Sequence, residues 1–222
     1  FAMQSPLSSG VLMADEVGLG KTIEAGLVLA QYWAERKRNI LLIVPAALRT
    51  QWRSELSEKF YIDSLILESS NFNKMRKEGS YNFAANKDSF VHAMPWDLVV
   101  LDEAHRLRNV YKPQNVTANK LKNALKGRKK LLLTATPLQN NLMELYGLVS
   151  FIDEHVFGDA KAFREMYVAV NNAELRNRNL RDRLSVFCKR TLRKQVTEYV
   201  RYTERHAILQ EYTPTKDEEL LY

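Results

Sequence analysis

Short apolar runs alternate with longer amphipathic stretches along the first two thirds of the chain. Continuous apolar runs, typical of parallel strands buried on both faces, predict strands at 11–14, 40–45, 96–101 and 130–137, with a weaker one at 64–67. Helical periodicity predicts helices at 23–34, 48–56 and 116–125. Strands that alternate with helices form parallel sheets. The pattern therefore predicts an α/β fold with a mainly parallel sheet and helices on both faces.

From residue 141 onward the pattern becomes mainly helical. It predicts helices over 142–152, 161–168 and 172–187, a strand over 205–212 and the start of a polar helix over 213–222. Residues 69–90 are polar and carry no clear element before Ser80. We therefore expect a helical extension on the C-terminal side of the sheet.

Positive charge is concentrated in this C-terminal part. The formal net charge of the chain is +7, and residues 161–206 alone hold twelve Lys/Arg against five Asp/Glu. A localised basic segment indicates a polyanionic partner. A solvated helical face has the same composition, so both interpretations stay open.

Composition narrows the class of protein. A chain of 222 residues with 45% hydrophobic residues can bury a large core. One cysteine, Cys188, excludes an intramolecular disulfide and a cysteine-rich metal site, and a buried thiol is expected there. No apolar run approaches membrane-spanning length and no secretory signal is visible, so we expect a cytoplasmic protein without a membrane partner.

Residues 14–26, A-D-E-V-G-L-G-K-T-I-E-A-G, contain the clearest chemical motif. Gly18-Leu19-Gly20-Lys21-Thr22 has the composition of a phosphate-binding loop: small residues turn backbone N–H groups toward a polyphosphate, Lys21 adds charge, and Thr22 offers a hydroxyl to Mg²⁺. The following helix adds its positive N-terminal end. Asp15 replaces the first glycine of the usual pattern. A tight strand-to-helix turn without ligand is the alternative.

Two further strand ends carry polar residues. Asp102 and Glu103 follow an apolar strand, where Asp102 is suited to hold Mg²⁺ and Glu103 to orient or deprotonate a water. A helix N-cap is the alternative for this pair. Thr134 and Thr136 end the next strand and are candidates to contact the carboxylates or His105, or to serve as strand-end caps. Because ligands bind beyond the carboxyl ends of parallel strands, these residues are expected at one site.

Together these motifs resemble a known family. Residues 14–26, D-E-A-H-R-L-R-N (102–109) and L-L-L-T-A-T-P-L-Q-N-N (131–141) are similar to motifs I, II and III of the Swi/Snf-like ATPases of helicase superfamily two. Residues 43–52 resemble motif Ia, Ser80-Tyr81 a small motif before motif II, 142–153 the helix after motif III, and 187–194 the basic segment that closes the first lobe. The residues of motif I look more like those of the bacterial and archaeal members, including the RNA-polymerase-associated branch.

The resemblance implies the first RecA-like lobe of an ATP-driven translocase on double-stranded DNA. It implies that Gly18, Leu19, Gly20, Lys21 and Thr22 bind ATP, that Thr22 and Asp102 hold Mg²⁺, and that Lys21, Asp102 and Glu103 are catalytic. His105, Thr134 and Thr136 would couple the nucleotide to the nucleic acid. The candidate backbone-phosphate contacts are Pro45, Arg49, Gln51, Ser80, Tyr81, Arg190, Arg193 and Lys194, whereas Trp52 is weighed as a core residue.

The sequence also departs from the family pattern. The glutamine that contacts adenine in the family is expected upstream of residue 1. Residues 1–212 would form the rest of the first lobe, with a basic, mainly helical segment at about 141–204. Residues 213–222 would begin the connection to a second lobe. Without the arginine of that lobe, worth about 10³–10⁵ in rate, we expect little hydrolysis. Family members place a strand before Ser80, which predicts that residues are missing between Gly79 and Ser80.

Two alternatives to the translocase remain. One is a strand-separating DNA or RNA helicase, or the motor subunit of a restriction or phage-defence complex. The other is a nucleotide-dependent module that docks on a partner such as RNA polymerase, with hydrolysis as a timer.

Overall fold

The computed structural model of the chain describes residues 2, 9–65, 87–169 and 172–196. The chain divides into two units, Phe1–Leu192 and Arg193–Tyr222, and each is described by itself. In the second unit the described residues form a 3₁₀ turn, Arg193–Gln195. The strands and α-helices that follow all belong to the first unit.

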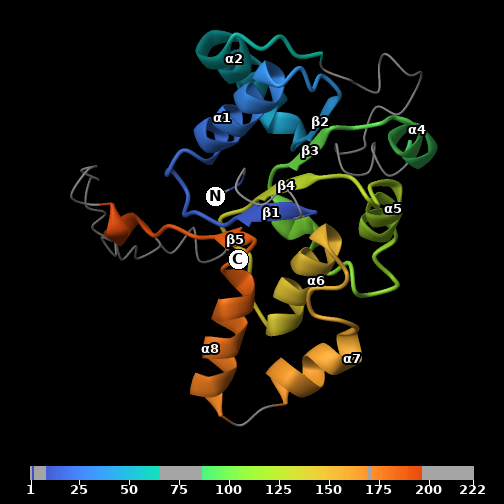
Figure 1. The fold of residues 1–222 in the computed structure, drawn as a ribbon, viewed down its shortest axis with the longest axis vertical. Coiled ribbons are helices and arrows are strands. Elements are labelled where there is room, and N and C mark those ends of the chain that lie inside the picture. The colour runs from blue at the N-terminus through green and yellow to red at the C-terminus, as the bar shows by residue number, and fades with distance from the viewer. Residues whose placement is uncertain (1, 3–8, 66–86, 170–171, 197–222) are drawn as a thin grey trace, which may run out of the picture. The chain divides into compact units, whose positions relative to one another are not determined.

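Five parallel strands form one sheet with the order β2-β3-β4-β1-β5 (Figure 1). They span Gly10–Met13 (β1), Ile40–Ile43 (β2), Leu98–Leu101 (β3), Lys130–Leu133 (β4) and Cys188–Lys189 (β5). Met13 lies opposite Leu133, and Leu101 lies opposite both Ile43 and Leu132. The carboxyl ends of β1 to β4 therefore meet at one edge of the sheet.

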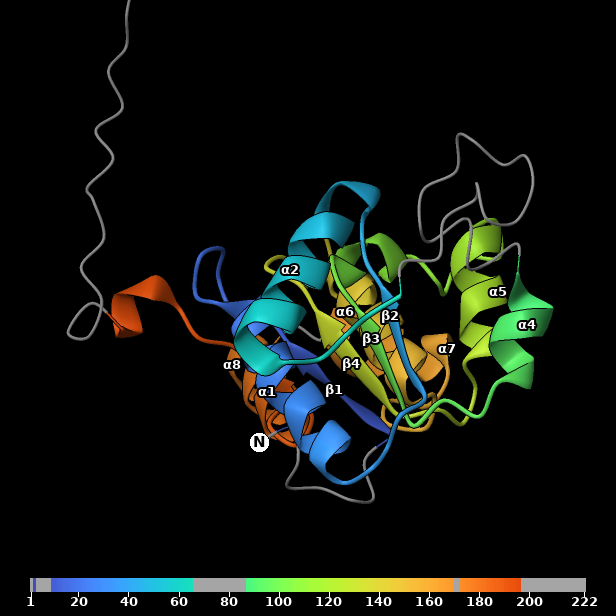
Figure 2. The same cartoon turned by 90° about the horizontal axis from the view of Figure 1, so that it is seen from above.

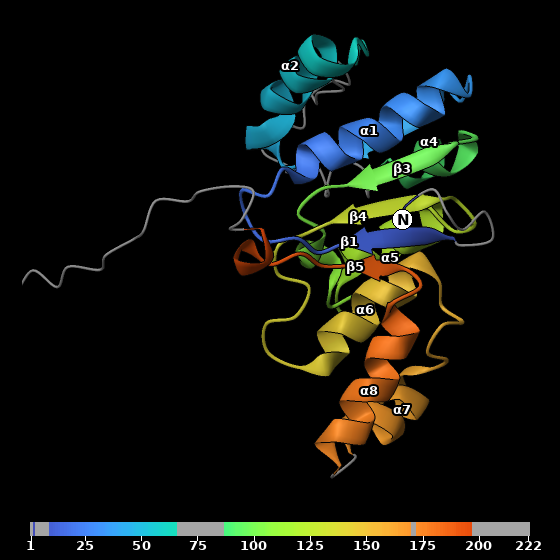
Figure 3. The same cartoon turned by 60° about the vertical axis from the view of Figure 1, so that its left-hand side comes forward.

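Helices cover both faces of this sheet (Figure 3). One core contains residues of α1 (Lys21–Ala34) and α2 (Arg49–Phe60), and the other contains residues of α4 (Asp88–Ala93), α5 (Val116–Ala124) and α6 (Leu142–Ile152). Successive strand residues alternate between the two cores, as the pleat requires. Seen from above, α4 and α5 lie side by side (Figure 2).

A helical extension follows α6. It consists of α7 (Ala160–Phe163), a π-helical turn (Arg164–Val168) and α8 (Ala173–Leu184). Aromatic rings hold it to the rest of the unit: the Phe163 centroid lies 5.1 Å from Tyr146 of α6, and the Phe157 centroid lies 6.5 Å from Phe187, just before β5. In the part of the chain that the structure describes, no helix is long and apolar enough to cross a membrane.

The predicted fold class is confirmed, including the parallel sheet, the helices on both faces and the helical extension. Several details differ. Residues 64–65 form no strand, the helix α4 was not predicted, and the helix expected over 172–187 ends at Leu184. The chain then adds the edge strand β5, which pairs with β1. The predictions for Ser80, Tyr81, the Gly79–Ser80 junction, the strand 205–212 and the helix 213–222 lie outside the described residues.

Lys130, the first residue of β4, is buried. Its Nζ donates to the carbonyl oxygens of Arg128 (3.0 Å) and Ile152 (3.4 Å) at the sheet edge opposite to the predicted site. Burial lowers the pKa of Lys130 to about 8, although Asp153 counteracts this shift. Folding therefore makes the charged form of Lys130 less favourable than it is in the unfolded chain.

We expect the free energy of unfolding to rise with pH between the folded pKa of Lys130, about 8, and its unfolded value, 10.5. In this window the unfolded chain binds more protons than the folded one, and the full contribution is about 3 kcal/mol. Lys130→Met should lack this rise, because it keeps an unbranched side chain without a titrating group. Urea unfolding of both proteins from pH 7 to 10.5 measures the difference, and parallel pH profiles would contradict the prediction.

Candidate nucleotide-binding site

The edge at which β1 to β4 end gathers the residues singled out from three sequence motifs. The loop after β1 runs from Ala14 to Gly20, Asp102 follows β3 directly, and Thr134 follows β4. Backbone hydrogen bonds join neighbouring strand ends: the Thr134 N–H donates to the Met13 carbonyl oxygen (3.0 Å), and the Asp102 N–H donates to the Ile43 carbonyl oxygen (3.0 Å). The predicted convergence of the three motifs at one edge is therefore present in the fold.

The loop before α1 has the backbone of an anion cradle. Gly18 and Gly20 adopt left-handed conformations with φ values of 83° and 81°, which side chains other than glycine rarely tolerate. Among the described residues, the N–H groups of Gly18, Gly20, Lys21 and Thr22 have no hydrogen-bond acceptor. Free donors at the first turn of a helix are suited to bind phosphate oxygens.

Lys21 and Asp15 shape the interior of this loop. The Lys21 Nζ donates to the carbonyl oxygens of Asp15 (3.0 Å) and Glu16 (3.3 Å), so the ammonium lies within the loop. Asp15, which replaces the first glycine of the motif, is buried and accepts a hydrogen bond from the Thr191 N–H. Burial, and then the neighbouring Asp15 carboxylate, raise the pKa of Glu24 to about 7. Asp15 thus fastens the loop to the segment after β5.

Asp102 is buried, and both of its carboxylate oxygens accept hydrogen bonds. Oδ1 accepts from the Glu103 N–H (2.8 Å), and Oδ2 accepts from the Trp52 indole N–H (2.9 Å). Glu103 adopts a left-handed conformation, with φ 52°, and its side chain is 37% exposed. Its Oε2 lies 3.0 Å from His105 Nδ1, within ion-pair distance, although the two atoms make no hydrogen bond.

The N-cap alternative for this acidic pair is not supported. Glu103 occupies the N-cap position of the 3₁₀ helix Ala104–Leu107, yet its side chain makes no capping hydrogen bond. The Asp102 carboxylate accepts from the N–H of Glu103, one residue ahead, and from the indole N–H of Trp52. The Glu103 carboxylate is therefore left accessible beside a buried aspartate.

The two threonines after β4 differ in exposure. Thr134 is fully buried, and its hydroxyl oxygen accepts from the Thr136 N–H (3.2 Å), whereas Thr136 is exposed. The bond fits the strand-end cap that the sequence left open for Thr134. The coupling role of Thr134, Thr136 and His105 stays a prediction.

A buried carboxylate that sequence analysis missed connects the second and third motifs. Glu144, in the first turn of α6, accepts from the N–H groups of Gln139 (2.8 Å) and Asn140 (3.1 Å) and from the Asn140 amide (2.9 Å). Its Oε2 lies 3.6 Å from an Arg108 nitrogen, and Arg108 also donates to the Gln139 side chain (2.7 Å). The spacing N-x-x-E, Asn141 to Glu144, resembles a capping box and was the available signal.

The candidate nucleic-acid contacts are only partly brought together. Arg49 and Gln51 lie in the first turn of α2, and Pro45 precedes it after β2. Gln51 is exposed and Arg49 half-buried. Arg190 is exposed directly after β5, whereas Arg193 and Lys194 belong to the second unit and Ser80 and Tyr81 lie beyond the described part of the chain.

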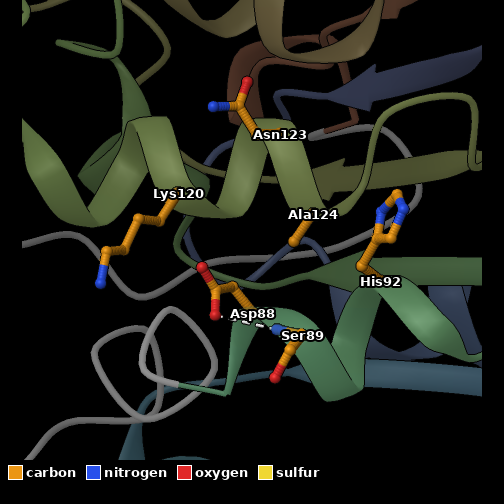
Figure 4. A pocket seen from close by; sticks show the side chains of 6 residues that line it. All are labelled: Asp88, Ser89, His92, Lys120, Asn123 and Ala124. Carbon is orange, nitrogen blue, oxygen red and sulfur yellow. Dashed lines mark hydrogen bonds between the residues drawn. The ribbon is translucent and has the colours of Figure 1, made fainter.

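A pocket of about 370 Å³ lies elsewhere, between α4 and α5 (Figure 4). It is lined by Asp88, Ser89, His92, Lys120, Asn123 and Ala124. None of these residues was predicted to bind nucleotide or nucleic acid.

The donor set at the sheet edge fits a magnesium nucleotide. Mg²⁺ prefers oxygen ligands, with one or two from carboxylates or hydroxyls and others from phosphates and water. Thr22 offers a hydroxyl at the start of α1, and Asp102 offers a buried carboxylate, a group whose two oxygens provide about four acceptor sites. The free loop N–H groups would meet the phosphates.

The chain matches a known protein family. A family described as SNF2-related domain matches residues 2–222. The uncharacterized ATP-dependent helicase YqhH of Bacillus subtilis is 36% identical over 79% of the chain, and the RNA polymerase-associated protein RapA of Stutzerimonas stutzeri is 34% identical over 69%. The chain spans only 32% and 18% of these relatives.

A solved structure shares the fold. It is the Sulfolobus solfataricus SWI2/SNF2 ATPase core in complex with dsDNA, which matches with a TM-score of 0.66 at 21% identity. The match covers 82% of this chain and 40% of that one. The chain therefore belongs to the SNF2-related domain family, whose members include the Swi/Snf-type ATPases.

Proposed function

We propose that the chain is the ATP-binding lobe of an ATP-dependent translocase on double-stranded DNA. The observation that carries the proposal is the meeting, at one sheet edge, of a loop with free N–H donors and the buried Asp102 with its accessible neighbour Glu103. Membership of a family of helicase-like ATPases supports ATP as the nucleotide. The fold relative in complex with dsDNA supports the substrate.

Each residue at the edge has a proposed role. The N–H groups of the Gly18–Thr22 loop bind phosphate oxygens, and Lys21 exchanges its two carbonyl acceptors for the phosphates. Thr22 and Asp102 hold Mg²⁺, which when bound neutralises charge on the β- and γ-phosphates. Glu103 orients the attacking water and accepts its proton.

The lobe is proposed to work with a second RecA-like lobe of the same parent protein. Phosphoryl transfer in such motors uses an arginine supplied across the nucleotide, worth about 10³–10⁵ in rate. Stepping along DNA requires two lobes that close and open around ATP. We therefore infer that residues 1–212 belong to the first lobe, that 213–222 lead to the second, and that the isolated chain hydrolyses ATP slowly.

The test is ATP hydrolysis by the two-lobed parent protein without nucleic acid and with duplex DNA, single-stranded DNA or RNA. Stimulation chiefly by duplex DNA is expected, with backbone contacts that make the effect weaken at high salt. Stronger stimulation by single strands or RNA would favour a strand-separating helicase instead. No stimulation by any nucleic acid would overturn the translocase.

A second candidate is a motor that docks on RNA polymerase, favoured by the 34% identity with RapA. Charge reversal at Arg190, Arg193 and Lys194 separates the two functions. For a translocase that uses these cations, DNA affinity and its salt dependence should fall. Unchanged DNA binding together with lost polymerase binding would favour docking.

A further inference from the structure

Trp52 is a buried residue with an unusual hydrogen-bond acceptor. It is only 3% exposed and lies in the first half of α2, within the core between α1, α2 and the sheet. Its indole N–H, which can only donate, bonds to the Asp102 carboxylate at 2.9 Å across 50 positions of sequence. Trp96 provides the comparison, because its indole N–H donates to the Val91 carbonyl oxygen (2.8 Å), an ordinary structural acceptor.

The bond from Trp52 completes the fixation of Asp102. Oδ1 accepts from the Glu103 N–H and Oδ2 accepts from the indole N–H. The carboxylate group therefore cannot rotate without losing a hydrogen bond. Hydrogen bonds to an ionised acceptor are about twice as strong as neutral ones. Groups that orient a metal-binding residue typically change metal affinity or activity by about 10–100-fold when they are removed.

The same bond reaches back to the candidate nucleic-acid contacts. Arg49 and Gln51 precede Trp52 in the first turn of α2, so all three residues move with this helix. Gln51 is exposed to solvent, whereas Trp52 is buried in the core between α2 and the sheet. A shift of α2 on binding a phosphate backbone would thus displace the indole N–H relative to Asp102.

We propose that Trp52 is a positioning residue: it orients the Asp102 carboxylate toward the magnesium nucleotide and couples this carboxylate to nucleic-acid contact at the start of α2. The inference rests on the proposed function for the identity of the ligand and of the nucleic acid. It adds a role for a tryptophan that would otherwise only fill the core.

The experiment compares Trp52→Phe with Trp96→Phe in the two-lobed protein. Each change keeps an aromatic ring and removes one indole donor. The measurements are thermal unfolding, the Mg²⁺ concentration for half-maximal binding of a fluorescent ATP analogue, and the ratio of DNA-stimulated to basal hydrolysis. Trp52→Phe should raise the Mg²⁺ requirement by about 10-fold or more and lower the stimulation ratio, whereas Trp96→Phe should change only stability.

Unchanged Mg²⁺ requirement and stimulation ratio in a folded Trp52→Phe protein would overturn the inference and leave Trp52 as a core residue. If Trp52→Phe does not fold, the protein with Trp33→Phe and Trp96→Phe gives a second readout from Trp52 fluorescence. Saturation with Mg²⁺ and nucleotide should shift the emission maximum of Trp52, because the charge beside the indole changes. An unchanged emission maximum would contradict the inference. Failure of the wild-type protein to bind nucleotide or respond to DNA would instead indicate failure of the proposed function.

Discussion

Glu103→Gln is expected to lower kcat for ATP hydrolysis by roughly 10²–10⁴-fold in the two-lobed protein. The amide keeps the size of the side chain but cannot accept the proton of the attacking water. ATP affinity should stay within a few-fold, because the proposed phosphate contacts come from the loop before α1 rather than from Glu103. Steady-state kinetics and nucleotide titration measure the two quantities.

The environment of Glu103 indicates that Glu103→Gln removes the carboxylate without disturbing the fold. Its side chain is 37% exposed, caps no helix, and makes with His105 a partly exposed 3.0 Å contact that is not a hydrogen bond. Stability should therefore change little. Glu58→Gln is the matched control, since this exposed carboxylate accepts from the Ser54 hydroxyl on the same helix, α2. A Glu103→Gln protein that keeps wild-type kcat would remove Glu103 from the mechanism.

Gly147→Ala should destabilise the fold by about 3 kcal/mol. Gly147 lies in the middle of α6, where a Cβ atom would come within 1.9 Å of the Arg108 carbonyl oxygen. Backbone cannot rotate away as a side chain can, so α6 and the segment after Asp102–Glu103 would have to separate. Urea unfolding of the full chain, with the midpoint and slope fitted together, measures the loss.

Gly26→Ala is the control for this prediction. Its Cβ would also come too close to a neighbour, 2.1 Å from Cε2 of Phe60, but that atom is at the end of a side chain that can turn. Alanine is also the better helix former by about 1 kcal/mol. The expected change in stability is within about 1 kcal/mol of zero, and equal losses for the two variants would refute the backbone argument.

The sequence predicted the sheet well because its strands are short apolar runs that end in polar motifs. It did not predict β5, since Cys188–Lys189 is a two-residue strand among basic residues and is held by backbone bonds to β1. It also missed α4, whose six residues follow a long polar stretch. Local periodicity detects an element only when it extends over several residues.

The position of the candidate site at one edge of the sheet could be predicted from the sequence, whereas the hydrogen bonds within the site could not. That Asp102 and the loop before α1 lie together follows from a general property of parallel sheets. The bond between Trp52 and Asp102 joins residues 50 positions apart and depends on how α2 packs on the sheet. Spacing in the sequence does not show the partners of such a long-range bond, whereas the local Glu144 bonds to Gln139 and Asn140 had a signal in the N-x-x-E spacing.

The pairing of β5 with β1 has a mechanical consequence. Leu12, Ala14 and Glu16 donate in turn to the carbonyl oxygens of Phe187 (2.7 Å), Lys189 (2.7 Å) and Thr191 (3.1 Å). Thr191 is two residues before Arg193, where the second unit begins. Tension on the chain at that junction would therefore act on the loop before α1, through a short ladder of three backbone bonds, before it reached the centre of the sheet.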